Sequence, residues 1–115
     1  MQPREPRTQA PQPTGNAYDD EQLLRLHESG GLLRPRRWSH FLFFADEPHA
    51  LHASSLLEPR WEAEVCPVTG GTGWQVAATG TVDAVGARRV TELRAWFTAF
   101  ATENGGEYDG WRAWA

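Results

Sequence analysis

The hydrophobic pattern of the chain is clearest at residues 40–45, which are nearly all apolar. Such a run predicts a strand that is buried on both faces near the centre of a sheet. A helix is expected next, with Asp46 as its N-cap, Glu47 and Pro48 in its first turn, and Pro59 limiting its length. The residues that recur at helical spacing and predict its buried face are Ala50, Ala53, Ser54 and Leu57.

Two further strands are indicated by alternation of apolar and polar positions. In residues 60–68, one face would carry Trp61, Ala63 and Val65, and the other Glu62, Glu64 and Cys66. In residues 74–82, one face would carry Trp74, Val76 and Ala78. The glycine-rich residues 69–73 between these strands are expected to form a hairpin loop, not a phosphate-binding loop, because no Lys follows and no helix begins there.

A long helix is predicted at about residues 84–104, with Asp83 as its N-cap and Gly105 just beyond its end. Its buried stripe is expected to consist of Val90, Leu93, Phe97, Phe100 and Ala101.

The chain then ends in a short aromatic segment that predicts one terminal strand, kinked or bulged at Gly110. Tyr108, Trp111 and Trp114 would pack on the sheet. In a regular strand Tyr108 and Trp111 face opposite sides, and a bulge at Gly110 would change that relation. We expect the two aromatics to serve two surfaces, one on the long helix and one on the open side, with Asp109 accepting hydrogen bonds.

A short helix is predicted before the first strand, at residues 18–29, with Asp19, Asp20 and Glu21 in its first turn, where the helix dipole favours acidic side chains. Leu23, Leu24 and Leu26 supply a partial apolar face. Residues 1–17 are rich in Pro and Gln and contain almost no large apolar residue, so they are expected to be disordered. The predicted organisation is a tail at 1–17 and one domain at 18–115.

After that first helix, the element order is strand, helix, strand, strand, helix, strand, which predicts an α+β fold of the ferredoxin-like split βαβ type. Four antiparallel strands in the order 4-1-3-2 would carry both later helices on one face. The open face would present Glu62, Glu64, Cys66, Gln75, Ala77 and Thr79. It would also carry one alternate set of the first strand, either His40, Leu42 and Phe44 or Phe41 and Phe43. Such a face binds a protein, is covered by the N-terminal helix, or does each over a different part.

Charge and composition narrow the functional classes. The 115 residues carry a net charge of −4, and an acidic domain without a broad basic face is a poor nonspecific nucleic-acid binder. The one basic cluster, at residues 34–37, fits a small anion site or a solvated loop. Cys66 is the only cysteine, which excludes an intrachain disulfide and suits the cytoplasm. Neither a signal peptide nor a membrane span is expected.

Few residues suggest catalysis or metal binding, and we predict a protein that is not an enzyme and has no cofactor and no metal. His49 and His52 lie one helical turn apart and could approach His40 or Cys66. A Cys66–His40 nucleophile pair lacks a third orienting group. Glu107 and Asp109 could form a carboxylate pair on the last strand.

The end of the chain resembles a known family. Ala101 is followed four residues later by Gly105-Gly106, and Glu107-Tyr108-Asp109-Gly110-Trp111 comes next. This segment, together with residues 39–44 and 74–78, resembles the regulator of ribonuclease activity B family. The likeness extends over roughly residues 19–115.

The resemblance implies a ferredoxin-like, non-enzymatic, cytoplasmic inhibitor that binds the noncatalytic part of ribonuclease E and modulates RNA turnover. Tyr108, Asp109, Gly110 and Trp111 would form its signature, which serves either folding or partner binding. Members commonly carry an acidic extension after this signature. If that extension contributes to binding, a chain without it shares the fold but not the partner. A small-molecule-binding regulatory domain of the same fold is the alternative.

Overall fold

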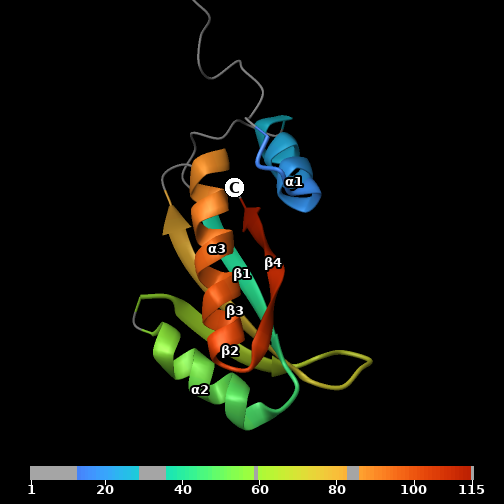
Figure 1. Cartoon of the computed structure of the whole chain (residues 1–115), viewed down its shortest axis with the longest axis vertical. Coiled ribbons are helices and arrows are strands. Elements are labelled where there is room, and N and C mark those ends of the chain that lie inside the picture. The colour runs from blue at the N-terminus through green and yellow to red at the C-terminus, as the bar shows by residue number, and fades with distance from the viewer. Residues whose placement is uncertain (1–12, 29–35, 59, 83–85, 115) are drawn as a thin grey trace, which may run out of the picture.

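The computed structural model describes residues 13–28, 36–58, 60–82 and 86–114, and Figure 1 shows their arrangement. The described helices are α1 (Ala17–Glu28), α2 (Glu47–Leu57) and α3 (Ala87–Glu103). The described strands are β1 (Arg36–Phe44), β2 (Glu62–Pro67), β3 (Trp74–Val82) and β4 (Gly106–Trp114). Residues 1–12 of the predicted tail lie outside the described residues.

The four strands form one antiparallel sheet in the order β2-β3-β1-β4. β1 therefore pairs on both sides, as its apolar composition predicted. The helices α2 and α3 contribute to the same buried cluster on one face of this sheet. The predicted α+β fold of split βαβ type, preceded by an additional helix, is confirmed.

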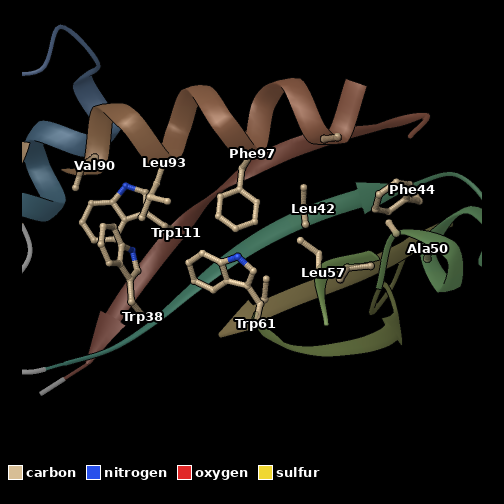
Figure 2. Packing of buried hydrophobic residues seen from close by; sticks show 14 of the residues in the cluster. Trp38, Leu42, Phe44, Ala50, Leu57, Trp61, Val90, Leu93, Phe97 and Trp111 are labelled. Carbon is tan, nitrogen blue, oxygen red and sulfur yellow. The ribbon is translucent and has the colours of Figure 1, made fainter. Parts of the chain in front are cut away.

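The buried core lies between the sheet and the helices α2 and α3 (Figure 2). The side chains that β1 directs into it are all fully buried or nearly so: Trp38, His40, Leu42 and Phe44. Since successive side chains of a strand alternate between faces, Phe41 and Phe43 lie on the opposite, open face. This resolves the alternative that the sequence left open.

The ends of the helices follow local capping rules. Asp46 caps α2 as predicted, because its side chain accepts a hydrogen bond from the backbone N–H of His49 at 2.9 Å. The predicted cap of the long helix is wrong: Gly86, not Asp83, is the N-cap of α3. Asp83 itself lies outside the described residues. At the other end Gly105, with φ of +82°, provides the left-handed turn that follows the helix.

The first strand is longer than predicted. Residues 36–39 lie outside the strand predicted at residues 40–45, but Arg36 pairs with Val82 and Arg37 pairs with Trp114. The strand extends because partners on both sides satisfy its backbone groups there. Of the predicted basic cluster, Arg37 forms an ion pair with Glu62 at 3.2 Å, and residues 34 and 35 lie outside the described residues.

The N-terminal helix packs against α3 and β4. Its Leu23 and Leu26 belong to the core cluster, whereas Leu24 remains 45% exposed. The interpretation that these leucines cover the open face of the sheet is therefore wrong. Leu23 and Leu26 pack into the core instead.

Phe97 tests this description of the core. It is fully buried and stacks on His40 at 4.3 Å between ring centroids. We expect Phe97→Ala to lower the free energy of unfolding by about 3–5 kcal/mol, because a large cavity would remain. Denaturant titration of this variant and of Thr98→Ala, whose exposed side chain is next to it on α3, measures the effect. Equal stability of the two variants would contradict the assigned core.

Candidate functional site

The strand β4 carries the signature residues Tyr108-Asp109-Gly110-Trp111 and is called the signature strand below. It contains the predicted bulge. Trp111 pairs with His40 and Tyr108 pairs with Leu42, so Asp109 and Gly110 both lie opposite Phe41. Gly110 adopts a φ of +104°, which side chains rarely tolerate. The additional residue brings Tyr108 and Trp111 to the same face of the strand. The expectation that the two aromatics serve two surfaces is therefore wrong, because both pack on the helix side.

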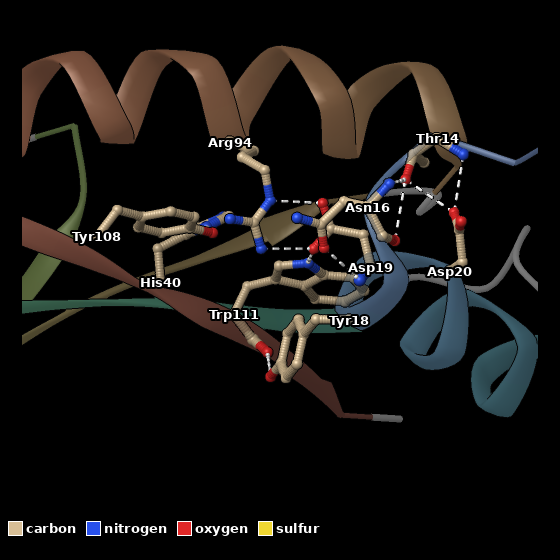
Figure 3. A network of polar contacts seen from close by, with 9 residues as sticks. All are labelled: Thr14, Asn16, Tyr18, Asp19, Asp20, His40, Arg94, Tyr108 and Trp111. Atoms are coloured by element: carbon tan, nitrogen blue, oxygen red, sulfur yellow. Dashed lines mark hydrogen bonds and ion pairs between the residues drawn. The ribbon is translucent and has the colours of Figure 1, made fainter.

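A buried carboxylate lies beside this strand (Figure 3). Asp19 of α1 is fully buried and accepts hydrogen bonds from Arg94 Nε at 2.6 Å and from Arg94 Nη2 at 2.8 Å. The indole N–H of Trp111 donates to the same carboxylate at 2.7 Å. The hydrogen bond to Asp19 raises the pKa of Arg94, so the guanidinium remains charged.

Tyr18, next to Asp19, attaches α1 to the signature strand a second time. Its hydroxyl donates a hydrogen bond to the backbone carbonyl of Trp111, and its ring meets the indole edge-on, with centroids 6.5 Å apart. A Cβ atom at Gly110 would lie 3.3 Å from the Tyr18 ring. Gly110 is therefore required both by its backbone angle and by this close approach.

An aromatic stack continues the cluster into the core. His40 Nδ1 lies 2.9 Å from the Tyr108 hydroxyl, and both rings stack on Phe97. The guanidinium of Arg94 lies over the Tyr108 ring at 5.1 Å, a cation–π contact. These contacts join residues of α1, β1, α3 and β4 into one cluster.

Burial determines the protonation of this cluster. Desolvation, followed by the charges of Arg89 and Arg94, lowers the pKa of His40 to about 3. Burial also raises the pKa of the Tyr108 hydroxyl above its ordinary value. His40 is therefore neutral at physiological pH and a poor proton acceptor, and its Nε2 has no hydrogen-bond partner among the described residues.

The structure separates the candidate catalytic residues. His40 lies in the core and Cys66 on the open face, so the Cys66–His40 nucleophile pair is not formed. His49 Nδ1 contacts Asp46 at 2.7 Å at the start of α2, and His52 is exposed. Within the described residues, no three His, Cys, Asp or Glu side chains group together as metal ligands.

The carboxylates of the last strand are also apart from any catalytic partner. Glu107 and Asp109 are exposed, and neither makes a hydrogen bond or ion pair with another described residue. The predicted anchoring role of Asp109 is therefore wrong. That role belongs to Asp19, which the sequence suggested only as a dipole-favoured residue of the first turn.

Sequence reasoning missed Asp19 and Arg94 as a pair. The available signal was Arg94, which follows Val90 by four residues and precedes Phe97 by three. That spacing places a charged side chain beside a buried apolar stripe, where a partner is required. The spacing could not identify the partner, which lies 75 residues away in the sequence.

No helix of the described part of the chain is both long enough and apolar enough to span a membrane.

The fold and the site together define a small α+β protein with a filled core on one side of its sheet and a second face that the described helices leave uncovered. Comparison with protein families matches the model for regulator of ribonuclease activity B over residues 17–112. This match covers nearly the whole chain, and the chain belongs to that family. No curated protein sequence gave a significant match.

The bulge at Gly110 generates one prediction. We expect Gly110→Ala to lower the free energy of unfolding by about 1–3 kcal/mol, because a side chain is strained at this φ and would press on Tyr18. Gly71→Ala is the matched control, since a Cβ there meets only Val68 at 3.6 Å and the backbone is not in the left-handed region. Thermal melting compares them. A Gly110→Ala protein as stable as the control would argue against the bulge.

The buried ion pair generates a second prediction. We expect Asp19→Asn to lower the free energy of unfolding by roughly 2–4 kcal/mol. The loss should stay below that of a fully enclosed pair, because the Arg94 side chain is 27% exposed. Glu21→Gln breaks the exposed pair with Arg25 and should cost at most about 0.5 kcal/mol. Equal denaturation midpoints would show that Asp19 does not hold α1 in place.

The lowered pKa of His40 predicts that the free energy of unfolding depends on pH. Its pKa in the folded protein lies below the unfolded value of 6.5, so the unfolded chain binds the proton more readily. The stability that neutral His40 contributes is therefore fully present above pH 6.5 and is lost as the pH falls towards 3. At pH 5 the loss should be about 2 kcal/mol.

Denaturant titrations at several pH values measure this loss. His40→Phe should remove that part of the pH dependence, whereas His52→Gln, at an exposed position of α2, should retain it. Parallel pH profiles for the wild type and His40→Phe would contradict the assignment.

Proposed function

We propose that this chain is a non-enzymatic regulator that binds ribonuclease E, or another component of the RNA degradation machinery, and inhibits RNA turnover. The family match over residues 17–112 carries this proposal. The protein would act in the cytoplasm, together with that partner.

The geometry supports binding in preference to catalysis. The side chains that could form a nucleophile pair lie on opposite faces of the sheet, and the one buried histidine is held neutral. The net charge of −4 also argues against inhibition by direct capture of RNA. A regulator of this kind would contact the ribonuclease itself.

The signature would contribute mainly through folding. Trp111 and Gly110 are buried and Tyr108 is half-buried, and all three contact α1 or the core. Asp109 is the one member of Tyr108-Asp109-Gly110-Trp111 whose side chain is exposed. In this proposal Asp109 is available to a partner, whereas its three neighbours hold the last strand in place.

A ribonuclease assay tests the proposal. Purified full-length ribonuclease E should cleave a structured RNA substrate more slowly as the protein is added, and the two proteins should co-elute in size-exclusion chromatography. Cys66→Ser should inhibit as well as the wild type, because binding needs no nucleophile. Unchanged cleavage together with separate elution would refute the proposal. A retained metabolite in the purified protein would favour a small-molecule regulator instead.

A further inference from the structure

The open face of the sheet has a distinct arrangement of side chains around Phe41 and Phe43 of β1. Across the strands, Phe43 lies in a row with Gln75, Cys66 and Glu107. Phe41 lies in a row with Ala77 and Glu64, and the bulge that contains Asp109 completes this row. We call these two rows the phenylalanine face.

The described elements leave this face accessible. The helices α2 and α3 contribute to the core on the other side of the sheet, and the buried leucines of α1 join the same core. Phe41 and Phe43 are only half-buried although they belong to a central strand, whereas Leu42 and Phe44 are fully buried. The β2–β3 loop approaches one end, where a Cβ at Gly73 would lie 2.4 Å from the Phe43 ring.

Within the two rows of the phenylalanine face, the charged side chains have one sign. Glu64, Glu107 and Asp109 are exposed and make no ion pair with any described residue. Basic side chains occur further along the same strands: Arg112 is opposite Ser39 in the adjoining row, and Arg37 is paired with Glu62. Adjacent strands are about 4.8 Å apart, so the carboxylates flank the two phenylalanines within about two strand spacings.

An apolar centre with unpaired acids on both sides fits a partner of complementary chemistry. Apolar side chains would cover the phenylalanine rings, and flanking Arg or Lys side chains would reach the carboxylates. A nucleic acid would be repelled, because its phosphates carry the same sign of charge.

We propose that the phenylalanine face binds a basic segment of a protein partner, one in which Arg or Lys residues flank apolar side chains. This inference rests on the proposed function, since it assigns the surface that would contact the ribonuclease.

Charge reversal tests the assignment. Full-length ribonuclease E is titrated with the wild type, with Glu64→Arg/Glu107→Arg and with Glu92→Arg/Glu103→Arg. The last variant makes the same change of net charge on exposed positions of α3. We expect the first variant to bind roughly tenfold more weakly or worse, and the α3 variant to bind nearly as well as the wild type. Equal binding by the two variants would overturn the assignment.

An apolar pair of variants provides a second readout. Phe41→Thr retains a strand-forming residue but removes the aromatic ring, and should weaken binding. Leu51→Thr changes a side chain that is 53% exposed on α2, and it should leave binding unchanged. Circular dichroism melting checks that each variant is folded.

A ribonuclease-independent experiment separates this inference from the proposed function. Two short synthetic peptides, one alternating Arg and Leu and one alternating Glu and Leu, are titrated into the isotope-labelled protein and followed by NMR. The Arg–Leu peptide should shift amide signals of Phe41, Phe43, Glu64 and Glu107, with affinity falling as salt increases. The Glu–Leu peptide should leave them unchanged.

The outcomes are distinct. If the wild type does not bind ribonuclease E but the Arg–Leu peptide shifts these signals, the proposed function fails and the phenylalanine face stands. If the ribonuclease binds every variant equally, or the signals shifted by the peptide belong to the helices, the assignment of the phenylalanine face is wrong. The proposed function as a regulator would still stand. Concentration-dependent shifts of the same signals without peptide would instead identify a second copy of this chain as the occupant and overturn the inference.

Discussion

The buried carboxylate of Asp19 holds three separate parts of this protein together. It belongs to α1, and it binds Arg94 of α3 and the indole N–H of Trp111 of β4. A charge without solvent is stable only when it is fully paired, so none of the three elements can move alone without exposing or orphaning a charged group. The position of the first helix therefore depends on this one side chain as well as on two buried leucines.

This interaction in turn depends on the bulge at Gly110. In a regular strand that keeps Tyr108 towards the core, Trp111 would point to the open face and could not reach Asp19. The additional residue turns Trp111 to the helix side, where Tyr18 packs against it. Glycine is needed for the backbone angle, tryptophan for the N–H donor and tyrosine for the stack on Phe97. Asp109 takes no part in these contacts and faces solvent.

The two sides of the sheet consequently have different roles. Aromatic rings, including the neutral imidazole of His40, fill the helix side of the sheet. The polar groups on that side therefore contribute to the stability of the fold. The other side presents half-buried phenylalanines and unpaired carboxylates. In the proposed function, this accessible side is the one that would contact a protein partner, and the chain belongs to the regulator of ribonuclease activity B family.

The sequence by itself determined the order of the elements, the central position of β1, the buried stripe of α3 and the exposed acids of β2. Each of these follows from local periodicity, because the repeat of a helix or strand determines which side chains share a face. Only the tertiary structure decided that Asp19 is buried, that it pairs with Arg94 and that Trp111 faces the helices. An acidic residue in a first helical turn has the same local pattern whether it meets water or a distant arginine. Packing between segments 75 residues apart made that choice.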